Sequence, residues 1–430
     1  MISKEIFSSS LQNCFKVKES DFTRTRKQSF STTLLFMMNS LTKSLSIEIE
    51  NFVSILKRDC GLTSLQSFTK SAFVQCRKKI RPEVFKKLSA MLTDEFYTDN
   101  ELGIKLWNGF RVLAVDGSSV TLPFTKELKQ LYGLAKNQTN TGVVQARVSV
   151  LYDVLNRYVL DSQLFPKAIG ERALGLLHLI KSKVNDLIIY DRGYPSYDFI
   201  YTHCNKDIDY LMRTKIGFNG ATESFIASNK RSQIVEIYPR KNINISDKEY
   251  DKNTPIKVRL LRIDLSSGET ELLMTSLLDS KKYPSKIFKE LYFKRWGVET
   301  FYDELKNKLK VEYFSGYSNQ SILQDFNAAI LISNVQTLIV NDLEDEVKEL
   351  TKNRKLTYKI NTNLSYGFLK NKIITLLFSN TDTEDIVEQL KILFKSELVP
   401  IRLGRSNIRN VQKYNRRKKP KVTKNQKDSI

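Results

Sequence analysis

Two aspartates in the 430-residue chain stand directly after short apolar segments. Asp116 follows residues 113–115 and Asp191 follows residues 188–190, with a glycine one or two positions further on. If these segments form neighbouring parallel strands, both carboxylates lie at one edge of a sheet, where open α/β folds place their sites. The two side chains are then able to share a metal ion. Taken singly, each aspartate is better explained as a turn or cap residue, because Asp close to Gly is common in turns.

A second group of polar residues has helical spacing. Tyr292, Arg295, Glu299 and Lys306 are separated by three, four and seven residues, which places them on one stripe of an α-helix. An apolar stripe beside it is predicted to pack on the core, so the polar stripe faces the edge of a cleft. By spacing alone, a solvated face with an ordinary ion pair between Arg295 and Glu299 is the better explanation.

The segments around the two aspartates predict a mixed sheet covered by helices. Three strands, a crossover helix and a fourth strand follow one another, and the first hairpin turns at Asn156–Arg157. Strand patterns return from about 207 to 284, and one continuous helix is predicted from about Ser285 to Lys310. The predicted core strands are 112–115, 148–155, 158–160 and 187–190, with a helix over 171–183.

The first hundred residues have helical periodicity and predict a small helical domain. Residues 64–71 separate a short helical segment from Ala72 to Lys79, which includes Arg77 and Lys78. This order fits a helix-turn-helix whose second helix contacts DNA. It fits two ordinary packed helices with a solvated basic face equally well.

The chain has 69 Lys and Arg residues against 47 Asp and Glu residues, a net charge of +22. This balance is typical of proteins that bind a polyanion, with nucleic acid as the first candidate. An anionic membrane is the rival partner. However, the most apolar segment, 326–340, is interrupted by polar residues such as Asn327 and Gln336 and is too short to span a bilayer. We expect a buried helix there and no membrane partner. No export signal is recognised at the start, so a cytoplasmic, nucleoid-associated protein is expected.

The segment from Tyr292 to Lys306 matches the Y-x2-R-x3-E-x6-K signature of the DDE transposases of the insertion sequence four family. Val115-Asp-Gly-Ser118 and Asp191-Arg-Gly-Tyr194 resemble the family's two aspartate strands, and the resemblance extends from about Phe22 to about Leu343. It implies an α/β fold: a ribonuclease-H-like mixed sheet flanked by helices. A β-rich insertion is implied between the second aspartate and the glutamate. The helical periodicity of the remaining sequence predicts helical N- and C-terminal parts.

The resemblance also implies roles for individual residues. Three carboxylates take the catalytic and metal-binding roles: Asp116, Asp191 and Glu299. Three further residues take the contacts to phosphates at the transposon end: Tyr292, Arg295 and Lys306. Hard oxygen ligands suit two Mg²⁺ ions, for which Mn²⁺ is expected to substitute. Trp296 is able to stack on an unpaired base of the DNA, although a Trp beside an apolar stripe is more often simply packed.

The resulting prediction is a DNA transposase that excises an insertion sequence and joins it to target DNA as a synaptic homodimer, with a hairpin intermediate implied by similarity alone. Two alternatives stay open: a ribonuclease-H-like nuclease or resolvase without strand transfer, and a non-catalytic DNA-binding regulator derived from a transposase. The predicted domains are a helical DNA-binding domain (1–105), the first part of the catalytic core (106–206), a β-rich insertion (207–284), the second part of the core (285–345), a helical C-terminal region (346–400) and a basic flexible tail (401–430).

Overall fold

The computed structural model describes residues 1–24, 27–39, 41–99, 103–135, 142–242, 244–265, 268–378 and 383–402. The predicted basic tail therefore lies outside the described residues from position 403 onward. Internal contacts divide the chain into two compact units. Unit 1 comprises Met1–Asp99, Val120–Ala146 and Asp303–Ile430, and unit 2 comprises Asn100–Ser119 and Arg147–Tyr302.

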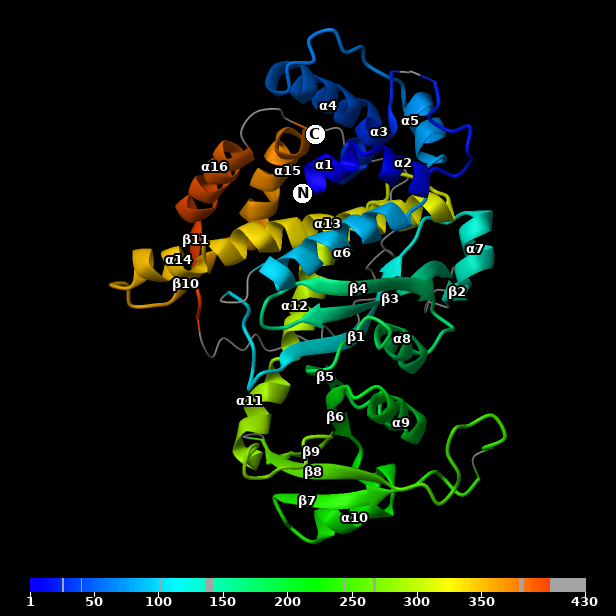
Figure 1. Cartoon of the computed structure of the whole chain (residues 1–430), viewed down its shortest axis with the longest axis vertical. Coiled ribbons are helices and arrows are strands. Elements are labelled where there is room, and N and C mark those ends of the chain that lie inside the picture. The colour runs from blue at the N-terminus through cyan, green and yellow to red at the C-terminus, as the bar shows by residue number, and fades with distance from the viewer. Residues whose placement is uncertain are drawn as a thin grey trace. The chain divides into compact units, whose positions relative to one another are not determined.

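Unit 2 is built on a mixed sheet (Figure 1). β3 pairs with β4 and β1, and the order then continues β5–β6–β9–β8–β7. The last residues of β1 and the first of β3 fall in the sequence of unit 1. The strands are β1 (Arg111–Thr121), β3 (Val143–Asp153), β4 (Val159–Pro166), β5 (Asp186–Tyr190), β6 (Asp209–Thr214), β7 (Ser232–Ile237), β8 (Ile256–Asp264) and β9 (Thr270–Thr275). The helices are α8 (Glu171–His178), α9 (Tyr197–Asn205), η1 (Ile216–Phe218), α10 (Gly220–Ala227), η2 (Ser285–Ile287), α11 (Phe288–Phe293) and α12 (Trp296–Asp303).

The pairing of the central strands sets the edge at which they end. β1 is parallel to β5, with Ala114 opposite Ile189, and β5 is parallel to β6, with Tyr190 opposite Met212. β5 and β6 therefore end at the same edge of the sheet, and the pairing of β1 with β5 stops there, although β1 itself continues to Thr121. The predicted strand 112–115 was therefore too short, and Asp116 lies within β1 rather than after it. β9, β8 and β7 continue the same sheet in antiparallel order beyond β6. This architecture confirms the predicted α/β class with a mixed sheet flanked by helices, and it is consistent with a ribonuclease-H-like fold.

Successive side chains of β1 and β5 point to opposite faces of the sheet. Both of these faces are buried. Leu113 and Ile188 contribute to a core with aromatic residues of α9 and α10. Val112 and Leu187 contribute to a second core with residues of α11. Both faces are covered, which explains why the strands before the two aspartates are apolar throughout rather than alternating.

The helix predicted from Ser285 to Lys310 is divided in the structure. α11 and α12 are separated by a tight turn in which the Arg295 N–H donates to the Tyr292 carbonyl and the Gly297 N–H donates to the Lys294 carbonyl. These bonds connect residues three apart, as in a 3₁₀ turn, and Gly297 is a poor helix former. The prediction of a continuous helix was therefore wrong at Arg295, which lies at the break.

A buried arginine anchors the chain that leads into α11. Arg259 of β8 is 1% exposed and donates from Nη1 to the carbonyl oxygens of Tyr283 (2.6 Å) and Leu277 (3.5 Å). Its guanidinium carbon lies 5.4 Å from the ring centre of Phe288, at the start of α11. These contacts fix the start of the helix that carries Tyr292.

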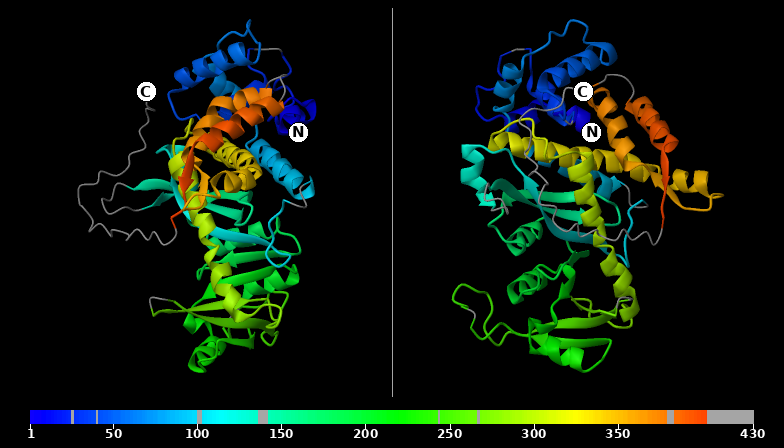
Figure 2. Two further views of the ribbon diagram at one scale, coloured as in Figure 1. Left: turned by 90° about the vertical axis from the view of Figure 1, so that its left-hand side faces the viewer. Right: turned by 180° about the vertical axis from the view of Figure 1, so that it is seen from behind.

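Unit 1 is mainly helical, and its long helix α13 runs beside α6 in the views of Figures 1 and 2. Side chains of α13 donate to Ser89 of α6 and to the Pro82 carbonyl that precedes it. The helices are α1 (Ile2–Ile6), α2 (Ser9–Phe15), α3 (Phe30–Met38), α4 (Leu45–Asp59), α5 (Lys70–Arg77), α6 (Glu83–Asp99), α7 (Lys126–Tyr132), the π-helical η3 (Glu304–Lys308), α13 (Asn319–Asp342), α14 (Glu344–Thr351), α15 (Thr362–Phe378) and α16 (Thr383–Ser396). The short strands are β2 (Leu134–Ala135), β10 (Tyr358–Ile360) and β11 (Leu398–Pro400).

The apolar segment 326–340 forms part of α13 and is largely buried, as predicted. Its polar residues are accommodated by hydrogen bonds: Asn334 donates to Ser89, and Gln336 donates to Ser365. Within the described ranges, no helix combines the length and the apolar character needed to cross a bilayer.

The structure does not support a helix-turn-helix in α4 and α5. Residues 60–69 separate these helices, a connection longer than the three- or four-residue turn of that motif. Arg77 at the end of α5 is buried, and it forms an ion pair with Asp325 (2.8 Å) and a hydrogen bond to Gln324. Arg77 therefore joins α5 to α13, and of the two explanations this contact favours the packed helices.

Candidate active site

Arg295 connects two of the three candidate carboxylates. Its Nη1 lies 3.3 Å from Asp116 Oδ2, and its Nη2 donates a 2.7 Å hydrogen bond to Glu299 Oε1. Arg295 is 5% exposed, so both ion pairs form where water screens charge poorly. A strand (β1), a helix (α12) and the turn before that helix supply the three side chains.

Asp191, directly after β5, is held by two other side chains of unit 2. The Tyr292 hydroxyl donates to its Oδ1 over 3.3 Å, and Arg213 Nη2 lies 2.9 Å from the same oxygen. Burial would raise the pKa of Asp191, but the backbone N–H of Arg192 and the charges of Arg213 and Arg295 hold it below its usual value. Asp191 is therefore ionised at neutral pH.

Arg213 lies outside the sequence motif, yet it touches a motif carboxylate. Its Nη1 also pairs with Glu271 Oε1 at 2.7 Å. Arg213 is in β6, within the span from about 207 to 284 where strand patterns are predicted, and β6 is the parallel neighbour of β5. A basic residue at the end of a strand that follows the second aspartate strand is the signal that could have identified it.

A fourth carboxylate, that of Glu171, lies close to Asp116. Glu171 begins α8, and a Cβ atom on Gly117 would come within 3.1 Å of its Cγ and Oε1 atoms. Arg147 Nη2 lies 3.9 Å from Glu171 Oε1. The absence of a side chain at Gly117 thus allows the first turn of α8 to approach the middle of β1.

The fold changes the ionisation of Asp116 as well. Burial raises its pKa to about 6, and the negative charges of Glu299 and Glu171 add to the increase. The backbone N–H of Gly117 and the charge of Arg295 act in the opposite direction and do not cancel it. The folded protein therefore binds a proton at Asp116 more tightly than the unfolded chain, whose Asp pKa is about 3.9.

This raised pKa gives a pH dependence of stability. The contribution of Asp116 favours the folded state below about pH 4 and is lost as the pH rises through about 6. We expect the stability of the native chain relative to Asp116→Asn to fall by about 2 kcal/mol between pH 4 and pH 7. Urea unfolding of both proteins in EDTA, at pH 4 and at pH 7, measures this difference in the free energy of unfolding. A stability difference that does not change with pH would mean that Arg295 outweighs burial and keeps Asp116 ionised.

Tyr302 links the helix of Glu299 to the strand of Asp116. Its hydroxyl is buried and donates a 2.6 Å hydrogen bond to the Asp116 carbonyl oxygen, with the Val148 carbonyl 3.4 Å away. Burial raises the pKa of Tyr302 well above its usual value, so the hydroxyl stays a donor. Tyr302 occupies a variable position of the motif, and no sequence pattern distinguishes it from a core aromatic residue.

The remaining motif residues lie at different places. Trp296 begins α12 and is 46% exposed, and the Arg295 guanidinium carbon is 5.5 Å from its ring centre. Its exposed ring leaves stacking on a base available. Lys306 lies in the π-helical segment η3, which belongs to unit 1. The structure thus groups Tyr292, Arg295 and the three carboxylates in unit 2, and it places Lys306 in the other unit.

The donor set has the right chemistry for a hard divalent cation. Carboxylate oxygens are the protein ligands that Mg²⁺ prefers, and Arg295 already places positive charge against Asp116 and Glu299. Among the described residues, no three acidic, His or Cys side chains are arranged to hold one ion. In this arrangement the two carboxylates face the guanidinium, so we expect an ion to compete with it for them.

Comparison with known proteins identifies the family. A family model described as the transposase DDE domain matches residues 107–335. No curated protein sequence gives a significant match. Among solved structures, a cryo-EM structure of the piggyBac transposase synaptic complex with hairpin DNA is similar over 96% of this chain and 87% of that chain, with a TM-score of 0.42 and 10% sequence identity. That likeness is too low for residues of the two proteins to be matched.

Proposed function

The chain belongs to the transposase DDE domain family, and we propose that it is a cut-and-paste DNA transposase. In this reaction it cleaves the phosphodiester at the end of an insertion sequence and joins the released 3′-hydroxyl to target DNA. The proposal places both steps at Asp116, Asp191 and Glu299, with divalent metal ions as cofactors. Mg²⁺ is the expected ion, two per site, and Mn²⁺ is expected to substitute.

One observation carries the proposal. The segment with the Y-x2-R-x3-E spacing contacts both aspartates: Tyr292 contacts Asp191, while Arg295 contacts Asp116 and Glu299. An ordinary surface ion pair at i, i+4 would involve Arg295 and Glu299 only. Contacts to both aspartates instead support a shared site at the carboxyl end of β5 and the part of β1 just beyond its pairing with β5.

The residues of the chain have separate tasks in the proposed reaction. When bound, divalent ions supply the positive charge that activates the attacking oxygen and stabilises the leaving oxygen. Asp116, Asp191 and Glu299 would hold them. Arg295 would then turn from the carboxylates to the scissile phosphate, because a guanidinium binds phosphate through a fork of two donors. Its buried Nε has no partner among the described side chains, so this donor is available to a ligand.

Three other motif residues would hold the DNA. Tyr292 would donate a hydrogen bond to a phosphate oxygen, since burial and nearby Asp191 raise the pKa of its hydroxyl well above its usual value. Lys306 would add a point charge for a second phosphate. Trp296, exposed beside Arg295, would stack on an unpaired base at the transposon end. The net charge of +22 supports a salt-dependent affinity for the DNA backbone.

The proposed partner is DNA, both as transposon ends and as target. Because two ends have to be held together during excision, we include a homodimer in the synaptic complex and a hairpin on the transposon end as parts of the proposal. The proposed cellular place is the nucleoid in the cytoplasm. Of these finer points, the hairpin follows from the resemblance in the Tyr292–Lys306 segment.

The decisive experiment incubates the full chain with a duplex carrying the flanking ends of its own element, a supercoiled target plasmid and Mg²⁺. Released ends and joined products together support a transposase. Cleavage without joined products identifies a nuclease or resolvase instead. Binding without cleavage in either Mg²⁺ or Mn²⁺ identifies a DNA-binding regulator.

Replacing Tyr302 with Phe tests whether the Asp116 backbone has to be held in place. The variant loses the 2.6 Å hydrogen bond to the Asp116 carbonyl. We expect the cleavage rate to fall about tenfold, as when other groups that orient metal ligands are removed, with unchanged DNA affinity. Single-turnover cleavage and DNA binding measure the two effects. Tyr250→Phe, which removes a hydroxyl that donates to Asp198, is the matched control; equal cleavage by both variants would limit Tyr302 to a structural role.

A further inference from the structure

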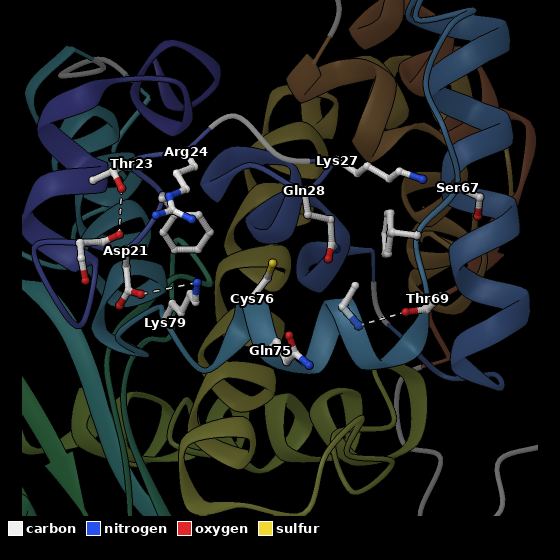
Figure 3. Close-up of a pocket in the computed structure, with 14 residues that line it drawn as sticks. Asp21, Thr23, Arg24, Lys27, Gln28, Ser67, Thr69, Gln75, Cys76 and Lys79 are labelled. Atoms are coloured by element: carbon white, nitrogen blue, oxygen red, sulfur yellow. Dashed lines mark hydrogen bonds and ion pairs between the residues drawn. The ribbon is translucent and has the colours of Figure 1, made fainter.

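A pocket of about 790 Å³ lies among the N-terminal helices of unit 1. Its lining comes from residues 20–24, from residues 27 and 28, from residues 67–69 and from α5 and the chain just after it (Figure 3). Small-molecule sites typically have volumes of roughly 300–1,000 Å³, so this pocket has room for a ligand of that size. All of its lining residues belong to unit 1, whereas the candidate carboxylates belong to unit 2.

Gln28 gives the pocket an unused hydrogen-bonding group. The residue is 4% exposed, and neither atom of its amide has a partner in the described part of the chain. Figure 3 shows its side chain pointing into the pocket, between Lys27 and Cys76. A buried amide without partners is unfavourable unless a ligand satisfies it. Rotation about its terminal bonds presents a donor and an acceptor side by side, the pattern that glutamine uses to bind the edge of a nucleobase.

The charged side chains of the pocket are mostly basic. Arg24 and Lys79 lie on one side of it and Lys27 lies on the other (Figure 3). Asp21 also lines the pocket, and its carboxylate is 3.6 Å from Lys79 Nζ. One of the three cations is therefore balanced by Asp21, which leaves Arg24 and Lys27 to attract an anion such as phosphate.

An aromatic side chain completes the set of groups. Phe22 is half-buried in the pocket wall, packs edge-on against Phe30 and has Lys79 Nζ 5.9 Å from its ring centre. Aromatic rings beside a positively charged groove are the means by which proteins bind unstacked bases. The pocket therefore has a group suited to each part of a nucleotide: Gln28 for the base edge, Phe22 for the base face, and Arg24 and Lys27 for phosphate.

We propose that this pocket binds one unstacked nucleotide, with the base edge at Gln28, the base face at Phe22 and the phosphates on either side of the nucleotide at Arg24 and at Lys27. The expected source is an unpaired nucleotide of DNA, and this choice of source rests on the proposed transposase function. A free nucleoside monophosphate has the same chemistry, so the two sources have to be distinguished by experiment.

The test compares two end-labelled duplexes of one sequence, fully paired or with a single unpaired deoxyadenosine, by fluorescence anisotropy with the full chain in EDTA. We expect the native chain to bind the bulged duplex about tenfold more tightly, the scale of one good base contact. Gln28→Met should remove this preference without lowering the melting temperature, because it replaces an unpaired amide by an apolar group of similar size. Gln66→Met is the matched control, at an exposed glutamine outside the pocket lining.

Lys27→Gln should weaken the bulge preference in the same way, while Lys57→Gln on the exposed face of α4 should not. Calorimetry with free deoxyadenosine monophosphate forms the second arm. If the monophosphate binds in a Gln28-dependent way and no bulge preference exists, the ligand is a free nucleotide. If neither probe depends on Gln28, the proposal is overturned. Because binding is measured without metal or cleavage, this result is independent of whether the chain joins DNA ends.

Discussion

Glu299→Gln is expected to lower cleavage and strand transfer by at least about a thousandfold, because several kcal/mol of charge stabilisation in the transition state depends on the metal-binding carboxylate. The substitution keeps the size of the side chain. The new amide oxygen is still able to accept the hydrogen bond from Arg295 that Glu299 now accepts. DNA affinity should therefore stay within about threefold of the native value, half a log unit on the affinity scale. Gel assays of cleavage and binding with end-sequence duplexes in Mg²⁺ measure both.

Glu290→Gln supplies the matched control for this prediction. Glu290 lies one helix earlier, in α11, and its side chain is 84% exposed with an i, i+4 ion pair to Lys294. Such surface pairs contribute little, so this variant should cut at the native rate. If Glu299→Gln cuts within tenfold of the native chain, Glu299 does not bind the catalytic metal, and the site has to be sought among other carboxylates such as Glu171.

The apolar strand segments before the two aspartates follow from the sequence because their burial dictates their composition, although β1 continues through Asp116 to Thr121. Residues 113–115 and 188–190 are apolar at every position, as in strands covered on both faces, and the structure pairs them in parallel. The hairpin at Asn156–Arg157 is likewise confirmed: Arg157 has a φ of 64° and the Asp153 N–H donates to the Tyr158 carbonyl. Local composition and turn chemistry suffice for such elements.

Other features depend on tertiary contacts that spacing does not encode. Helical periodicity is the same whether a helix is continuous or interrupted, so it does not predict the break at Arg295. The poor helix former Gly297 is the one local residue type that indicates a break. The sequence includes Arg77 in a helix that could contact DNA. In the structure, Arg77 is buried and is bound by Asp325 and Gln324, almost 250 positions away. The role of Arg213 was not predicted, because its ion pair with Asp191 depends on the pairing of β6 with β5.

Arg295→Met is expected to have opposite effects on stability and on metal affinity. Without metal, the variant leaves Asp116 and Glu299 without their shared cation. Because both carboxylates are partly exposed, the loss should be about 2–3 kcal/mol, below the value for a fully buried pair. Divalent ions no longer have to displace the guanidinium, so Mg²⁺ should raise the melting temperature of the variant more than that of the native chain. Cleavage should fall at least about a hundredfold, since a donor to the reacting phosphate is lost.

Thermal unfolding across a Mg²⁺ titration separates this competition from a purely structural role. Arg262→Met, which breaks an exposed pair with Asp264 in β8, is the control and should show the native Mg²⁺ response. Arg295→Lys should not restore the native behaviour, because one ammonium group does not reproduce a fork that reaches two carboxylates at once. Equal Mg²⁺ shifts in the native chain and in Arg295→Met would show that the guanidinium does not compete with the ion. In that case its contacts to Asp116 and Glu299 persist when metal is bound, and the scissile phosphate would have to be held by other cations such as Arg213.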